Sequence, residues 1–182
     1  MRMSKVNLNA NEREKELEYW RPLVEEIRED AVHGSVYLAN QALNIVEDFV
    51  QRQLYRNRTE LIQNLAKLSN ALVRAKPLMA LIYNRTKRVL QFIQSLPKEE
   101  KNIQVIKEAT LEEIGRIRQE AEENFKKIAR LGSRLILDYH VILTHSSSSI
   151  IEAIFLEAHR QKKRFRVIVT ESRPLFEGRD LA

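Results

Sequence analysis

Apolar residues recur at intervals of three and four along most of residues 11–137, and this spacing constrains the fold more than any other feature of the sequence. Side chains with this spacing share one face of an α-helix, and that face must be buried against other elements. Gly and Pro number only four each, which favours long helices over a fold with many turns. In the segment 98–137, the buried apolar stripe is expected to extend to Ile128 and Leu131. The pattern predicts helices over 11–30, interrupted at Pro22; 36–50; 59–74, capped by Thr59; 77–95, with Pro77 in its first turn; and 98–137.

The C-terminal part changes to a strand–helix–strand pattern. Val141–Leu143 is a short apolar run, 150–161 is amphipathic with helical spacing, and Arg166–Thr170 is rich in β-branched residues. This order is typical of a βαβ unit, whose strands are parallel. We therefore predict a mostly α fold: an N-terminal helical domain over 1–137, ending in a long connector helix, and an incomplete βαβ unit over 138–182. Because parallel sheets are normally covered on both faces, either the protein is truncated or the bundle or another chain supplies the missing cover.

The composition excludes several classes of site. The chain has no cysteine, so it contains no disulfide, thiolate metal site or cysteine nucleophile. Its four histidines lack metal-ligand spacing, and we predict neither a metal nor a cofactor. The formal charge is +6, but the lysines and arginines largely alternate with glutamates, as on any solvated helix. The basic run 160–166 is interpreted as a solvated helix end, where cations are favourable. Direct nucleic-acid binding is therefore not expected. With no apolar run of membrane-spanning length and no signal-peptide core in residues 1–11, we expect a cytoplasmic protein.

The turn after the first strand carries the best candidate binding residues, Ser146, Ser147, Ser148 and Ser149. The N-terminus of the following helix presents backbone N–H groups and the positive end of the helix dipole, which together can bind a phosphate. In open α/β sheets, ligands bind beyond the carboxyl ends of the strands, where this turn lies. The serines could instead serve only to cap the helix, and the sequence leaves both interpretations open.

A second group of polar residues follows the second strand. Since parallel strands end at the same edge, we expect Arg173 to lie near the serine turn, where its guanidinium would bind a phosphate through paired hydrogen bonds. The alternative for Arg173 is a salt bridge with Glu171 or Glu177. His145 and Glu171 are secondary candidates, and His145 is interpreted as a structural hydrogen-bonding residue because no third group that would orient a Ser/His pair is visible. We predict no catalytic residue.

The same segments carry a resemblance to a known family. DYHVILTHSSSS (138–149) and RFRVIVTESRPLFEGR (164–179), with GSVYLA (34–39) and KPLMALIYN (76–84), resemble the alpha, beta and delta regulatory subunits of initiation factor 2B. The superfamily also includes ribose-1,5-bisphosphate isomerase and methylthioribose-1-phosphate isomerase. The resemblance implies a helical domain followed by a Rossmann-like domain, of which most is missing here, and assembly as a homo- or hetero-oligomer.

The resemblance implies a regulatory or scaffold role. The isomerases use a cysteine in the turn after the first strand and an aspartate further along; this sequence has serines at the turn and ends before the aspartate. An arginine commonly precedes the helical-domain glycine in the isomerases, whereas here His33, a further secondary candidate, precedes Gly34. We expect protein–protein contact with initiation factor 2 or a related subunit. The alternative is a sugar-phosphate isomerase, or an inactive remnant of one, that binds a phosphorylated small molecule.

Overall fold

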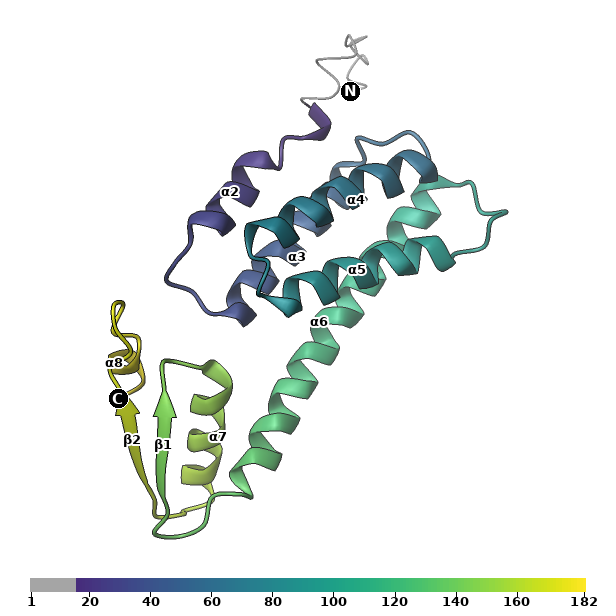
Figure 1. The fold of residues 1–182 in the computed structure, drawn as a ribbon. Helices are drawn as coiled ribbons and strands as arrows, with labels where there is room; N and C mark the ends of the chain where they lie inside the picture. Colours follow the sequence, from purple (N-terminus) through teal and green to yellow (C-terminus); the bar gives the residue numbers. More distant parts are fainter. Residues whose placement is uncertain (1–15) are drawn as a thin grey trace, which may run out of the picture. The chain divides into compact units, whose positions relative to one another are not determined.

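The structure is a computed structural model, and it describes residues 16–182 apart from the side chain of residue 180. The helices and strands are α2 (Arg21–Glu29), α3 (Ser35–Arg52), α4 (Arg58–Ala75), α5 (Ala80–Ser95), α6 (Ile103–Ser133), β1 (Val141–His145), α7 (Ser149–Arg160), β2 (Arg166–Thr170) and α8 (Gly178–Leu181) (Figure 1). The mostly α fold with a partial α/β unit is confirmed. The chain divides into two compact units inside α6, one ending at Gly115 and the other comprising Arg116–Ala182. The domain boundary expected after residue 137 stays a prediction.

The first unit is a helical bundle whose core is formed by the apolar faces of α2 to α5 and the first turns of α6. Fully buried side chains come from successive elements and include Leu43, Leu65, Ile82 and Ile106. Ser69 on α4 donates a buried hydrogen bond of 2.8 Å to Thr86 on α5, so the polar groups at this helix contact are satisfied. The helical periodicity of the sequence therefore identified the faces that build this core.

Two helix starts in the bundle differ from the predicted ones. Thr59 is not an N-cap: the cap of α4 is Asn57, whose side chain accepts a hydrogen bond of 2.9 Å from the backbone N–H of Glu60. Asparagine caps a helix at least as well as threonine, and it comes two residues earlier, so it takes the position. Pro77 does not lie in the first turn of α5, because the Met79 N–H closes a tight turn on the preceding residues.

The predicted interruption of the first segment is present in the described part. Residues 18–20 form a turn, and α2 begins at Arg21 with Pro22 at the start of the helix, where its missing N–H costs no hydrogen bond. Residues 11–15 of that predicted segment lie outside the described residues.

The C-terminus of α5 is held by a side chain from α4. The Arg58 guanidinium donates hydrogen bonds to four carbonyl oxygens, those of Ile93 (2.6 Å), Gln94 (3.1 Å), Leu96 (2.8 Å) and Pro97 (2.7 Å). The last carbonyls of a helix have no intrahelical partner and carry the negative end of its dipole, so a cation stabilises them. Arg58 thereby joins the start of α4 to the end of α5.

The long helix α6 is shorter than the predicted 98–137. It begins after Asn102, whose side chain accepts a hydrogen bond of 3.0 Å from the N–H of Gln104. Its end is capped by Lys163, whose ammonium donates to the carbonyls of Ser133 (2.7 Å) and Ile136 (2.8 Å). One residue of the basic run that we interpreted as a solvated helix end therefore caps a neighbouring helix.

The buried stripe expected on the last turns of α6 is wrong at two positions. Ile128 is 43% exposed and Leu131 is 49% exposed, whereas Ala129 and Ser133 are buried. In this part of α6 the small residues face α7, because the two helices approach so closely that a Cβ on Gly132 would lie 2.5 Å from the side chain of Ile154. The close approach excludes the larger apolar side chains from the contact.

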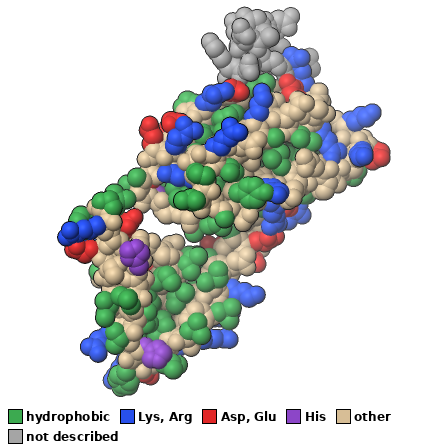
Figure 2. All heavy atoms as spheres, viewed as in Figure 1, with side chains coloured by type: hydrophobic (Ala, Val, Ile, Leu, Met, Phe, Trp, Pro, Cys, Tyr) green, Lys and Arg blue, Asp and Glu red, His purple; other side chains and the backbone are tan. Residues whose placement is uncertain are grey.

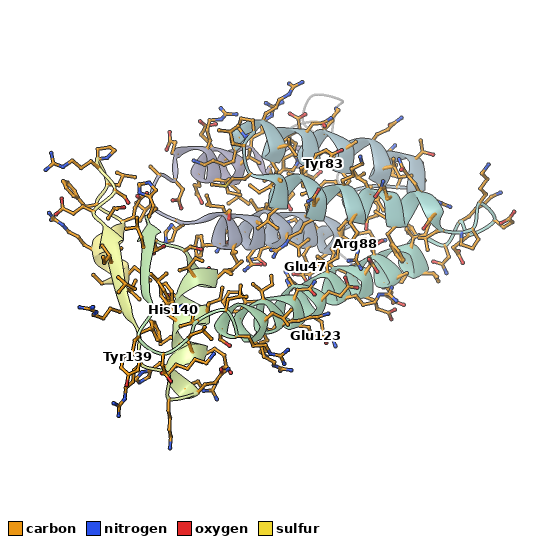
Figure 3. All side chains as sticks on the ribbon, turned by 60° about the horizontal axis from the view of Figure 1, so that its bottom comes forward. Glu47, Tyr83, Arg88, Glu123, Tyr139 and His140 are labelled. Atoms are coloured by element: carbon orange, nitrogen blue, oxygen red, sulfur yellow. The ribbon has the colours of Figure 1, made fainter. Side chains whose placement is uncertain are left out.

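The second unit contains the predicted βαβ arrangement. β1 and β2 are parallel neighbours in a two-stranded sheet, paired from Val141 with Arg166 to His145 with Thr170, and α7 connects them. The loop before β1, with Tyr139 and His140 (Figure 3), is tied to the start of β2, since the Arg166 N–H donates to the His140 carbonyl at 2.9 Å. The parallel pairing places the C-terminal ends of both strands at one edge of the sheet.

One face of the sheet carries exposed apolar side chains. Val141 and Leu143 on β1 are 52% and 69% exposed, and Ile168, the register partner of Leu143, is 54% exposed. Ile142 and Val167, which point to the opposite face, are half-buried. Within this unit, only one face of the sheet is therefore covered.

Candidate functional site

The segments that carry the candidate residues leave the sheet at the same edge. His145, the last residue of β1, is the register partner of Thr170, the last residue of β2. The serine turn continues directly from His145, and Glu171–Pro174 continues directly from Thr170. The structure therefore brings together two segments that lie about 25 residues apart in the sequence, as parallel pairing predicts.

A cluster of hydroxyl groups joins these segments. His145 Nδ1 lies 2.7 Å from Thr170 Oγ1 and 3.3 Å from Ser172 Oγ, and the backbone N–H of Ser146 donates to Ser172 Oγ at 2.8 Å. Ser146 and Ser172 both have left-handed backbone conformations, with φ of 62° and 59°. Such conformations cost about 1 kcal/mol for a residue with a side chain. The hydrogen bonds of the cluster stabilise this strained turn.

A carboxylate also reaches the serine turn. The hydroxyl of Ser146 donates to Glu177 Oε2 at 3.2 Å. Glu177 comes directly before α8, whose Gly178 lies so close to β2 that a Cβ there would be 1.8 Å from the Thr170 carbonyl oxygen. Only glycine permits this approach, and the approach holds Glu177 against the turn. A phosphate bound at Ser146 would meet this negative charge, which opposes its binding.

Arg173 makes a cation–π contact in place of the salt bridge considered for it. Its side chain is exposed and its guanidinium carbon lies 5.8 Å from the centre of the Phe176 ring, a cation–π contact. The ion pair considered for Arg173 is instead made by Arg179, which lies 2.6 Å from the Glu171 carboxylate. Among the described side chains the guanidinium of Arg173 has no hydrogen-bond or ion-pair partner, so it is available to a ligand.

The start of α7 is not capped by a serine side chain. Ser148 occupies the N-cap position, but its hydroxyl makes no cap hydrogen bond. Ser147 and Ser149 are exposed, and Glu152 adds a carboxylate to the first turn, where the helix dipole favours it. The interpretation in which the serines serve only to cap the helix therefore does not describe Ser148. Two carboxylates therefore belong to this region, Glu152 in the first turn of α7 and Glu177 at the serine turn.

His33 belongs to the first unit and is engaged locally. Its Nδ1 lies 2.7 Å from the Asp30 carboxylate, and its ring stacks on Tyr37 with 4.0 Å between the ring centres. The backbone N–H of His33 donates to the same carboxylate at 2.8 Å, and this hydrogen bond lowers the pKa of Asp30 below its usual range. These contacts order the loop between α2 and α3.

Three residues of the site were missed in the sequence. Ser172, Glu177 and Gly178 make the contacts that shape the serine turn, yet none has a motif that marks it alone. The available signal was positional: polar residues directly after a strand lie beside the turn that follows its parallel neighbour. The described part of the chain contains no helix with the length and hydropathy to cross a membrane, and no group of three or more metal-ligating side chains.

Comparison with known proteins identifies the family of this arrangement. A protein from Pyrococcus furiosus, named as a translation initiation factor eIF-2B subunit 2-like protein, is 33% identical over 160 residues, covering 88% of this chain and 52% of the relative. Ribose 1,5-bisphosphate isomerase from Archaeoglobus fulgidus is 29% identical over 154 residues, covering 85% of this chain and 46% of the enzyme. The chain thus spans about half the length of the relatives it matches.

The fold and the family model agree with these relatives. The tetrameric eIF2B beta2-delta2 complex from C. thermophilum contains a chain that superposes with a TM-score of 0.72 over 89% of this chain and 55% of that chain. At 19% identity this likeness shows a shared fold. The model of the initiation factor 2 subunit family matches residues 31–182, which confirms the resemblance drawn from the motifs. The chain therefore belongs to the initiation factor 2 subunit family.

Proposed function

We propose that this chain is a non-catalytic regulatory or scaffold unit of the initiation factor 2B type, acting in the cytoplasm through contact with initiation factor 2 or a related subunit. The observation that carries the proposal is the chemistry of the serine turn. The resemblance implies a cysteine at this turn in the isomerases, whereas this chain has serines, and the hydroxyl of Ser146 donates a hydrogen bond to Glu177. A thiolate nucleophile is therefore missing at the position where the enzymes need one.

The surrounding groups do not replace that nucleophile. A serine nucleophile requires a histidine base that a third group orients. In the described part of the chain, His145 contacts the hydroxyls of Thr170 and Ser172 through Nδ1, and no carboxylate binds it. The contacts of His145 join the two strand ends, which supports its interpretation as a structural residue.

The first experiment measures binding to initiation factor 2 directly. The purified factor is immobilised, and the full chain is titrated to about 50 µM by biolayer interferometry, a range that includes transient regulatory contacts. Unphosphorylated and phosphorylated factor are compared, because a regulatory unit is expected to distinguish them. The absence of binding to both forms, by a chain with a native circular dichroism spectrum, would refute the proposal.

Assembly with further copies or related subunits belongs to the same proposal. The exposed sheet residues Val141, Leu143 and Ile168 form an apolar patch of the kind that parallel sheets normally cover, and the C. thermophilum relative of the same fold is a tetramer. Sedimentation velocity of the chain is expected to show a species larger than the monomer, and Leu143→Asp should shift it to the monomer. A monomer at about 100 µM would contradict self-assembly and leave a hetero-oligomer to be tested.

Binding of a phosphorylated small molecule is a second candidate, favoured by the uncapped start of α7 and by the relationship to ribose 1,5-bisphosphate isomerase. A ligand that binds only the folded chain raises the melting temperature. We expect ribose 1,5-bisphosphate or a purine nucleoside monophosphate to do so, Arg173→Ala to abolish the shift, and Glu177→Gln to enlarge it by removing the opposing charge. Arg164→Ala, an exposed arginine away from the turn, is the matched control. A shift unaffected by Arg173→Ala and Glu177→Gln would place the ligand elsewhere.

A further inference from the structure

A groove runs along the contact between the C-terminal half of α6 and α7, inside the second unit. It has a volume of about 490 Å³, and its walls are the two helices. The residues that line it are Phe125, Lys126, Ala129 and Arg130 on α6, and Ala153, Leu156, Glu157 and Arg160 on α7. We call it the α6–α7 groove. It is separate from the serine turn, and none of its residues belongs to the candidate site described above.

The groove follows from the side chains at the helix contact. α6 and α7 approach closely at Gly132 and Ile154, and the groove is lined beside this contact by Ala129, one turn before Gly132, and by Ala153, next to Ile154. Alanine is too small to fill the space beside this contact, so an apolar floor is left open between the helices. The lining of α7 extends from Ala153 to Arg160, about 10 Å along a helix. This length matches about two turns of a partner helix.

The margins of the groove are basic. Lys126 and Arg130 lie one turn apart on one wall and Arg160 on the other, against the single carboxylate of Glu157. Lys126 pairs with Glu122 at 3.1 Å and Arg160 with Glu157 at 3.5 Å, but the two cationic side chains are 67% and 81% exposed, and exposed ion pairs are weak. Arg130 has no ion-pair partner among the side chains that the structure describes. Arg130 is therefore available to a carboxylate of a bound molecule, and Lys126 and Arg160 can exchange their weak, exposed ion pairs for one.

Exposed apolar side chains complete the surface. Leu156, on the α7 wall, is 57% exposed. Figure 2 shows hydrophobic side chains gathered on the viewed face of this unit, with lysines and arginines at its margin. An apolar floor between basic margins is complementary to an amphipathic helix that carries apolar residues on one face and carboxylates beside them. A basic or uniformly polar segment would gain neither the apolar contacts nor the ion pairs.

We propose that the α6–α7 groove binds an acidic amphipathic helix of a partner protein. Its apolar residues, spaced three and four apart, lie over Ala129, Ala153 and Leu156, and its flanking carboxylates pair with Arg130 and Arg160. A contact of about two helical turns buries little area, so the expected dissociation constant is on the order of 10 µM. The inference goes beyond the proposed function, because it concerns this groove and holds whichever protein supplies the helix.

The test uses the full chain and a fluorescent synthetic helix of about 18 residues, with leucines at helical spacing and glutamates on both flanks. Fluorescence anisotropy should show binding that weakens with added salt, and the same peptide with lysines in place of the glutamates should not bind. Arg130→Glu should weaken binding about tenfold, and Leu156→Ala about fivefold. Both residues are exposed, so the variants are expected to fold, and circular dichroism confirms it.

Matched controls and a second measurement make the outcome decisive. Lys127→Glu reverses a charge on α6 outside the groove, and Leu135→Ala truncates a leucine that is 79% exposed outside it; both should leave peptide binding unchanged. Equal losses with Arg130→Glu and Lys127→Glu, or equal affinity for the lysine peptide, would overturn the proposal. Sedimentation showing a dimer that Leu156→Ala dissociates would also overturn it, since a second copy would occupy the groove. Loss of initiation factor 2 binding with peptide binding intact would contradict only the proposed function.

Discussion

Replacing Arg58 with alanine should destabilise the helical bundle by about 3 kcal/mol. The guanidinium donates four hydrogen bonds to the carbonyls that end α5, and those to Ile93 and Leu96 are partly buried. A net contribution of about 1.5 kcal/mol is typical of a hydrogen bond from a charged donor, and water replaces the two exposed bonds at little cost. The two partly buried hydrogen bonds therefore sum to about 3 kcal/mol, more than the roughly 2 kcal/mol that a cation contributes at most through the helix dipole alone.

The single tryptophan makes the measurement specific to this unit. Trp20 is the only tryptophan in the chain and is 4% exposed, directly before α2, so its fluorescence during urea unfolding reports the bundle. A loss of 3 kcal/mol should lower the melting temperature of a unit of about 100 residues by more than about 10 °C. Arg58→Lys should recover less than half of the loss, because one ammonium cannot reach all four carbonyls.

Arg56→Ala is the matched control, since this arginine lies two residues earlier with an exposed side chain and should change stability by less than about 0.5 kcal/mol. If Arg58→Ala and Arg56→Ala unfold at the same urea concentration, the capping of α5 by Arg58 contributes nothing. The reasoning from hydrogen-bond geometry to stability would then be refuted for this helix end.

Three further predictions concern other contacts. Gly178→Ala should destabilise the second unit by about 2–4 kcal/mol in urea unfolding followed by far-ultraviolet circular dichroism, because the new Cβ would overlap the Thr170 carbonyl; an unchanged midpoint would contradict the close approach. Tyr19→Phe should cost about 1–2 kcal/mol at pH 7 by removing the 2.6 Å hydrogen bond to Asp48. Burial and that carboxylate raise the pKa of Tyr19, so the stabilisation by this hydrogen bond is fully present below about pH 10 and is lost at higher pH. The Phe variant should therefore lose less stability than the original chain above about pH 10. Asp30→Ala should cost about 1 kcal/mol at pH 7, because the carboxylate accepts hydrogen bonds from the backbone N–H groups of Val32 and His33. The hydrogen bond from His33 lowers the pKa of Asp30, so this difference should be present above the usual aspartate pKa and be lost as the pH falls through the lowered one; a pH-independent difference would contradict it.

Several elements were predictable because their signals are local. Arg166–Thr170 was expected as a strand and is β2 residue for residue, because a run of β-branched side chains favours the extended backbone of a strand. The faces of α3 and α4 followed from helical spacing, because an apolar stripe must be buried whatever covers it. Misplaced boundaries, such as the cap of α4 at Asn57 and the end of α6 at Ser133, depended on single hydrogen bonds that compete within a few residues.

Part of the candidate site could also be predicted from the sequence, and part could not. The sequence indicated that the serine turn and the segment after β2 lie at one edge, because parallel pairing follows from the strand–helix–strand order. It did not indicate that Ser172 and Glu177 would bind the turn while Arg173 stacks beside Phe176. Those contacts depend on the left-handed turns at Ser146 and Ser172, which bring residues 26 apart within hydrogen-bonding distance.

The type and order of most helices and strands, the burial faces of most helices and the family all followed from the sequence, because periodicity and motifs are properties of neighbouring residues. The tertiary structure alone decided which side chains meet across elements. Arg58 binds the end of a helix that lies 35 residues away, and small residues at the contact of α6 with α7 open a groove that no motif marks. Such contacts depend on the distance and angle between packed helices, which the whole set of buried side chains sets together rather than any one segment.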